Sequence, residues 1–142
     1  MKNGTSTDTA TLEMWRSANA KNEYQGQWPR TLCVCSAGLL RSPTLAWVLS
    51  NEPYNCNVRA AGSHPEYALV PLDRVLLTWA QRVVFVNREN HERAKESGLE
   101  WKADTYILDV PDQYNFRQEE LVNAIRMELE KVGFPHYARR AA

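Results

Sequence analysis

The sequence predicts an α/β protein in which a four-stranded parallel sheet carries helices on both faces. Its 142 residues match the size of one ordinary domain. Short apolar segments of strand length alternate along the chain with segments of helical periodicity. Strands separated by helices require crossover connections, which produce parallel pairing. Hydrophobic residues make up 44% and charged residues 24% of the chain, so collagen-like, coiled-coil and disordered classes are excluded.

Four strand and helix pairs are expected in order along the chain. The first is a strand at residues 31–34 and a helix that begins at Ser42-Pro43, because Ser is a strong helix N-cap and Pro is favoured at the first helical position. The later strands are expected near residues 57–61, 82–86 and 105–108. The later helices are expected near residues 71–80, 89–97 and 118–132.

The two ends of the chain are expected to flank this domain. Residues 1–29 are polar and irregular and form an N-terminal extension with one candidate helix at residues 11–20. The domain itself is expected to span residues 30–135. Residues 136–142 then form a C-terminal tail, in which two arginines are interpreted as solvated.

Charge and cysteine usage limit the partners. Seventeen basic residues balance seventeen acidic residues, so neither a nucleic-acid partner nor an anionic membrane is expected. The first residues contain no apolar leader, which favours a cytoplasmic location. The three cysteines, Cys33, Cys35 and Cys56, lack a second C-x-x-C pair. We therefore expect reduced thiols, with no metal and no cofactor.

The segment after the first predicted strand has the spacing of an anion-binding loop. Five residues separate Cys35 from Arg41 and Ser42. They are Ser36, Ala37, Gly38, Leu39 and Leu40. In a parallel sheet, anions bind where the carboxyl end of a strand leads through a loop into a helix N-terminus. Five residues can wrap with inward backbone N–H groups, and Gly38 permits the positive φ that such a loop needs.

Three side chains of this loop suit phosphate chemistry. The planar guanidinium of Arg41 can donate two parallel hydrogen bonds to phosphate oxygens. Inward amides, the helix N-terminus and Arg41 favour the nucleophilic thiolate form of Cys35. Ser42 can donate a hydrogen bond to the sulfur when it leaves a phosphocysteine. The alternative interpretation makes Cys35 a buried apolar residue and Arg41 a surface helix cap.

The segment VCSAGLLRSPT resembles the phosphate-binding loop of the low-molecular-weight protein tyrosine phosphatase superfamily. Supporting similarity lies at RAAGS (residues 59–63) and in residues 78–86. The segment LDVPDQY (residues 108–114) is similar to a short bacterial branch with an LDIPD motif. The resemblance covers roughly residues 30–132. It implies a three-layer sandwich in which residues 30–135 are a phosphatase domain.

The chain departs from the family loop at three positions. Ala37 and Gly38 stand where family members usually carry Gly and Asn, and that Asn organises the loop through side-chain hydrogen bonds. Leu40 stands where many members carry a second cysteine as an oxidation partner. The resemblance therefore leaves open what holds this loop rigid.

A phosphomonoesterase of this kind needs a proton donor from another strand end. Asp109 and Asp112 are the candidates, and Asp112 is favoured because the Pro-Asp pair resembles the acid-bearing loop of the family. An ordinary turn role is the alternative for either residue. Tyr114 and Phe116 follow, and they form either a wall for a phenyl ring or core anchors for the last helix. His64 and His91 are interpreted as solvated.

The resemblance implies a cytoplasmic, metal-independent enzyme that hydrolyses phosphotyrosine in proteins or peptides through a phosphocysteine intermediate. Inorganic phosphate and other oxyanions would bind the same loop. Two alternatives stay open. One is a catalytically impaired module that binds phosphorylated ligands. The other is an arsenate reductase, which shares the fold and loop but usually uses two further cysteines near the third strand, where residues 83–98 contain none.

Overall fold

The computed structural model describes residues 27–38, 41–111 and 118–137. Four parallel strands form one sheet in the order β2-β1-β3-β4. They are β1 (Arg30–Cys35), β2 (Asn57–Gly62), β3 (Arg82–Phe85) and β4 (Asp104–Ile107). The predicted fold class is confirmed. The candidate helix at residues 11–20 lies outside the described residues.

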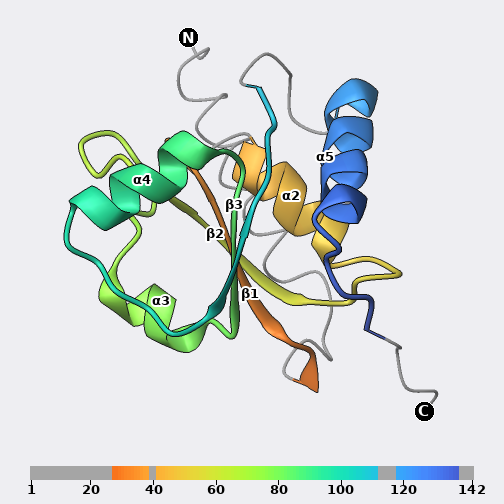
Figure 1. Cartoon of the computed structure of the whole chain (residues 1–142), viewed down its shortest axis with the longest axis horizontal. Coiled ribbons are helices and arrows are strands. Elements are labelled where there is room, and N and C mark those ends of the chain that lie inside the picture. Colours follow the sequence, from red (N-terminus) through yellow and green to blue (C-terminus); the bar gives the residue numbers. More distant parts are fainter. Residues whose placement is uncertain (1–26, 39–40, 112–117, 138–142) are drawn as a thin grey trace, which may run out of the picture.

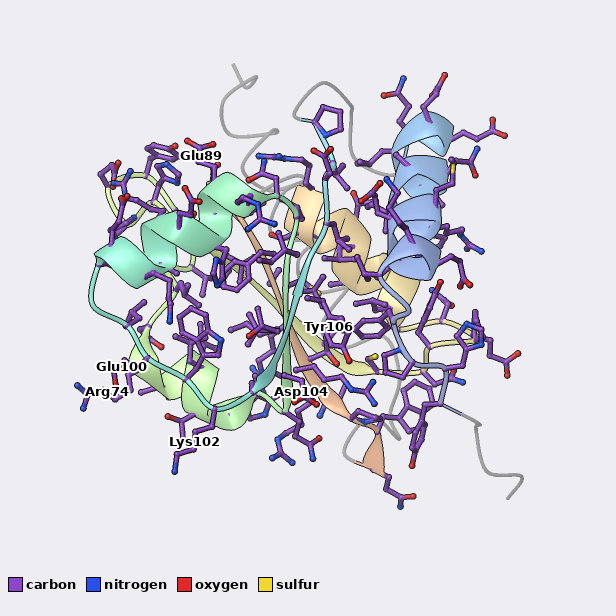
Figure 2. All side chains as sticks on the ribbon, viewed as in Figure 1. Arg74, Glu89, Glu100, Lys102, Asp104 and Tyr106 are labelled. Carbon is purple, nitrogen blue, oxygen red and sulfur yellow. The ribbon has the colours of Figure 1, made fainter. Side chains whose placement is uncertain are left out.

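Two helices cover each face of the sheet, so the molecule has three layers (Figure 1). The helices α2 (Arg41–Leu49) and α5 (Glu119–Lys131) pack on one face. The helices α3 (Arg74–Trp79) and α4 (Arg88–Glu96) pack on the other. Tyr106 projects from β4 toward the α5 side (Figure 2), where its ring meets Phe134 edge-on with 4.8 Å between the ring centroids.

The central strand β1 is buried on both faces. Leu32 and Val34 join the apolar cluster under α3 and α4, whereas Cys33 and Cys35 join the cluster under α2 and α5. This alternation follows from the two-residue period of a strand. A strand covered on both faces reads as a continuous apolar run, which is the pattern of residues 31–35.

Local capping decides where two helices begin. The helix predicted near residues 71–80 begins at Arg74, because the Asp73 carboxylate accepts a hydrogen bond from the Leu76 N–H at 2.9 Å. In the same way, the Asn87 side chain caps α4 by accepting from the Asn90 N–H at 3.1 Å. The last helix agrees with its prediction to within one residue at each end.

Residues at both ends of the described chain contact the sheet domain. Trp28 is buried, and the Pro29 carbonyl accepts from the Asn57 N–H at 2.9 Å. At the other end, the Tyr137 N–H donates to the Pro53 carbonyl at 3.0 Å, and the Asn55 side chain donates to the Tyr137 carbonyl at 2.8 Å. Within the described ranges, no helix has the length and apolar character needed to span a membrane.

Candidate active site

The loop of interest joins the carboxyl end of the central strand to a helix N-terminus. Cys35 is the last residue of β1 and Arg41 is the first residue of α2. Gly38 has φ +76°, so the positive backbone angle predicted at this position is present. Leu39 and Leu40 lie outside the described residues. The strand, the loop and the helix therefore have the order that an anion site in a parallel sheet requires.

The Cys35 thiol is buried in contact with two polar groups of its own loop. The Gly38 N–H donates to Sγ at 3.2 Å, and the Ser42 Oγ lies 3.2 Å from the same sulfur. The Ala61 carbonyl lies 3.5 Å from that hydroxyl. When the sulfur is a thiol, Ser42 accepts from it and donates toward Ala61. When the sulfur carries negative charge, the hydroxyl proton can rotate toward it.

Arg41 is buried and links the loop to the segment that follows the edge strand β4. Only 4% of its surface is exposed, and its Nη1 donates to the Val110 carbonyl at 3.0 Å. The alternative interpretation of Arg41 as a surface helix cap is therefore wrong. The hydrogen bond with Val110 fixes the guanidinium relative to the segment that follows β4, which carries the two candidate acids.

The residues after β2 support the loop from behind, and we call residues 63–70 the backing segment. Its backbone N–H groups donate to three successive carbonyls of the loop. These bonds run from Ser63 to Cys35 at 2.8 Å, from His64 to Ser36 at 3.0 Å and from Leu69 to Ala37 at 3.2 Å. Loop and backing segment therefore form one hydrogen-bonded layer.

Gly62 allows this close approach. A Cβ at position 62 would lie 2.6 Å from the Ala37 carbonyl carbon and 2.7 Å from the Ser36 carbonyl oxygen. Both contacts are with backbone atoms, which cannot rotate away as a flexible side chain can. A side chain at position 62 would therefore displace the loop from the end of β2.

A buried asparagine of α4 joins the loop to the backing segment. Asn90 is 0% exposed, and its Nδ2 donates to the Ser36 Oγ and the Ser63 Oγ, each at 3.1 Å. The Ser63 Oγ also lies 3.1 Å from the His64 Nδ1. This cluster joins the residue after the thiol to the residue after β2 through side chains alone.

The two histidines interpreted as solvated are not. His64 is buried, and its ring stacks on that of Tyr67 with a centroid distance of 5.3 Å. His91 is partly buried against Phe85 and Trp101 at centroid distances of 5.1 and 5.9 Å. Burial, with Lys95 and Arg88 adding to it, lowers the pKa of His91 below its usual value. In both cases an aromatic ring packs against the imidazole.

Of the two candidate acids, the structure describes Asp109, whereas Asp112 and the candidate walls Tyr114 and Phe116 lie outside the described residues. Asp109 is exposed, and its backbone N–H donates to the Glu128 Oε1 at 3.0 Å. Beside it lies an open pocket of about 330 Å³ that Arg88 also lines. Within the described ranges, no hydrogen bond joins the Asp109 carboxylate to the loop.

The other two thiols are buried behind the site. Burial raises the pKa of Cys33 well above its usual value, and the nearby Cys56 and Cys35 sulfurs add to the effect. Burial also raises the pKa of Cys56. All three cysteines are free. Among the described residues, no group of three or more His, Cys, Asp or Glu side chains has an arrangement that could hold a metal ion.

Comparison with known proteins gives a limited result. No protein-family model and no curated protein matches the chain. Among solved structures, the chain is similar to a thioredoxin-dependent arsenate reductase from Corynebacterium glutamicum, at 16% sequence identity and a TM-score of 0.47. The match covers 88% of this chain and 71% of that chain. At this identity and TM-score, the likeness assigns neither a family nor an activity.

Sequence reasoning placed the residues of the loop but missed those that support it. Asn90, Ser63, Gly62 and the Val110 carbonyl were not recognised as parts of the site. The RAAGS similarity at the end of the second strand was a signal for Gly62 and Ser63. Asn90 stands in a helix of charged residues, where nothing in the local pattern distinguishes it.

Proposed function

We propose that this protein is a metal-independent protein tyrosine phosphatase that uses Cys35 as its nucleophile. One observation carries the proposal. At the end of the central strand, the buried Cys35 sulfur lies between the Gly38 N–H and the Ser42 hydroxyl. The buried Arg41 follows at the other end of the same loop. A nucleophile, a cradle of amides and a fixed guanidinium are the parts that phosphoryl transfer to a thiolate needs.

The reaction proceeds in two displacements at phosphorus. The Cys35 thiolate forms a sulfur–phosphorus bond while the bond from phosphorus to the phenolic oxygen breaks, and that oxygen takes a proton from an aspartic acid. The resulting carboxylate then removes a proton from a water molecule. The water oxygen bonds to phosphorus, the sulfur–phosphorus bond breaks, and inorganic phosphate and the thiolate are released.

Each loop residue has a distinct part in these steps. Arg41 and the N–H groups of residues 36–41 hold the equatorial oxygens, where negative charge is redistributed in the transition state. The N-terminus of α2 adds positive potential at the same place. The Ser42 hydroxyl donates a hydrogen bond to the Cys35 sulfur as the thiolate leaves the phosphocysteine.

The position of Asp112 in the chain supports its assignment as the acid. It follows Val110 by two residues, and the Val110 carbonyl is bonded to the Arg41 guanidinium. Because the chain spans at most about 3.6 Å per residue, the bond between Arg41 and Val110 would allow an acid two residues further along the chain to reach a bound phosphate. Asp109 remains the alternative acid, although its backbone is tied toward Glu128.

The backing segment supports an aryl phosphate as substrate. Tyr67 is 55% exposed and Leu69 is 44% exposed, so both side chains are accessible to a ligand. The Leu69 N–H is bonded to the loop carbonyl of Ala37, so these side chains stand beside the phosphate loop. With Tyr114 as a second wall, they would form an apolar slot for a phenyl ring.

The test is hydrolysis of an aryl phosphate and of a phosphotyrosine peptide, with chelator and reductant present, from about pH 5 to 8. Wild-type protein should turn over, Cys35→Ser should not, and Asp112→Asn should lose more activity than Asp109→Asn. Turnover by the Cys35→Ser variant would contradict the proposal. Phosphotyrosine binding without turnover would indicate the binding module instead, and thioredoxin-dependent reduction of arsenate would indicate the reductase.

A further inference from the structure

The loop contains no side chain of its own at position 38, where Gly38 occupies the left-handed backbone region. A side-chain amide from α4 contacts the loop instead. Asn90 reaches the loop across a sequence separation of 54 residues and donates to the Ser36 hydroxyl. Glu89, its neighbour in the helix, is exposed and projects outward (Figure 2), so only Asn90 of this pair faces inward.

The contacts of Asn90 enclose the thiol residue on two sides. Ser36 follows Cys35 directly, and the Ser63 N–H is bonded to the Cys35 carbonyl at 2.8 Å. Because one Nδ2 group donates to both serine hydroxyls at 3.1 Å, it fixes the spacing between the loop and the backing segment. Both hydrogens of that nitrogen are used by these two contacts.

The burial of Asn90 is unusual for a residue with a purely structural role. Its Oδ1 is buried and has no hydrogen-bond partner among the described residues. A buried acceptor without a partner is unfavourable and calls for an explanation, and a role in a functional site is one such explanation. An apolar residue would fill this position without leaving an acceptor unpaired.

The start of α4 has a side-chain cap, and its next turn is paired with the backing segment. The Asn87 side chain caps the helix by accepting from the Asn90 N–H. One helical turn later, Arg93 donates to both carboxylate oxygens of Glu66 in the backing segment, at 2.9 and 3.1 Å. The Asn90 contact to Ser63 and the Arg93 contact to Glu66 thus join the helix to the backing segment at two points.

We propose that Asn90 is a positioning residue for the phosphate loop and acts on it from another helix. By holding Ser36 against Ser63, it fixes the Cys35 sulfur and the inward N–H groups in the arrangement that receives a phosphate. This inference rests on the proposed function. The amide is required because it donates twice and carries no charge, whereas a carboxylate would accept and would repel the anion.

The test compares Asn90→Ala and Asn90→Asp with Asn87→Ala as the matched control. Asn87→Ala removes the cap of the same helix, and so loosens α4, while the amide of Asn90 and both serines remain. We expect the Asn90 variants to lower kcat/KM for an aryl phosphate, and the affinity for inorganic phosphate, at least about tenfold, as the loss of one or two hydrogen bonds predicts. Asn87→Ala should lower the melting temperature but change both quantities less than about twofold.

Equal losses of kcat/KM in Asn87→Ala and Asn90→Ala would overturn the inference, because Asn90 would then act only through helix stability. Unchanged phosphate affinity in the Asn90 variants would overturn it as well. If the Asn90 variants do not fold, Ser36→Ala and Ser63→Ala remove the two contacts singly. Each should reduce phosphate affinity, and the two effects should be non-additive in the double variant, whereas no effect in either would contradict the inference.

Two readouts separate this inference from the proposed function. Phosphate affinity is measured by calorimetry in the Cys35→Ser background, which has no turnover. The rate of Cys35 alkylation by iodoacetamide is measured in the native protein. If wild-type protein hydrolyses no aryl phosphate, the proposed function fails. Asn90 is then still judged by phosphate affinity and thiol reactivity, and no change in either would refute its positioning role.

Discussion

At the scale of single residues, the Ser42 hydroxyl has two acceptors between which it can switch. It lies 3.2 Å from the Cys35 sulfur and 3.5 Å from the Ala61 carbonyl. In the proposed reaction, a hydrogen bond to the sulfur is needed when the phosphocysteine breaks down and the thiolate is re-formed. Ser42 should therefore matter more to the second displacement than to the first.

Replacing Ser42 by Ala should lower kcat about 10- to 100-fold, because a hydrogen bond to a charged group is lost in the dephosphorylation step. A burst of released phenol should appear in rapid-mixing experiments, since the phosphocysteine then accumulates. Ser50→Ala is the control, because Ser50 is also buried but donates to the Trp47 carbonyl. A kcat in Ser42→Ala equal to that of the wild type would contradict this role.

We predict that both the stability of the protein and the position of the phosphate loop require a glycine at position 62. Gly62→Ala should destabilise the protein by about 2 kcal/mol through overpacking and reduce kcat/KM about 100-fold through displacement of the loop. Gly98→Ala is the control, since its φ of +84° imposes strain but open space surrounds the added Cβ. Urea denaturation and aryl phosphate assays measure both effects. Full activity in Gly62→Ala would show that the loop tolerates the shift.

The reach of sequence reasoning at this scale depends on how local the chemistry is. Cys35, Arg41 and Ser42 fall within eight consecutive residues, so their spacing alone predicted a phosphate loop. Asn90 meets Ser36 only because β1 and the helix after β3 are brought together by the sheet. His64 and His91 failed as predictions because each imidazole packs against an aromatic ring, and the local sequence pattern did not show that packing.

At the scale of elements, strand and helix positions followed from periodicity, whereas their exact starts depended on caps. The Asp73 side chain begins α3 three residues later than predicted, since it bonds the Leu76 N–H. The order β2-β1-β3-β4 was not predicted, because apolar strands of similar length carry no mark of their neighbours. Only tertiary packing distinguishes them.

The packing of α4 on the sheet makes stability depend on pH through His91. Burial lowers the pKa of His91 in the folded protein, so the unfolded chain binds this proton more readily. The stability that neutral His91 contributes is complete above its usual pKa of about 6.5 and is lost as pH falls through the lower folded value. The free energy of unfolding should therefore decrease from about pH 7.5 to 5, and the decrease should be smaller in His91→Gln.

Urea denaturation at several pH values provides this measurement. His136→Gln is the control. His136 is exposed beside Glu130, and this contact lowers the pKa of the Glu130 carboxyl, which lies below the pH range of this experiment. The control should keep the wild-type decrease between neutral and mildly acidic pH. A pH dependence of His91→Gln identical to that of the wild type would rule out His91 as its source.

At the scale of the whole molecule, a ligand of the loop should stabilise the entire domain. The loop is bonded to the backing segment and, through Arg41, to the segment after β4. Inorganic phosphate at 100 times its dissociation constant should therefore add about 2.7 kcal/mol to the free energy of unfolding. Calorimetric melting of wild-type and Cys35→Ser proteins should show this stabilisation, and Arg41→Ala should lose it.

Arg74→Ala is the control for that experiment. Arg74 is exposed on α3 (Figure 2), so its replacement removes the same charge at a place away from the loop. It should keep the stabilisation by phosphate. An equal loss in both arginine variants would mean that phosphate acts through net charge and not through the loop.

The central place of β1 also has a consequence for how the chain folds. The strand that carries Cys35 is made first, yet it pairs with β2 on one side and with β3 on the other. The contact between Arg41 and Val110 closes a separation of 69 residues. Contacts of such long range form slowly, because the loop entropy is lost before the contact is gained. If the proposed activity holds, it should therefore return in refolding only when the complete sheet has formed.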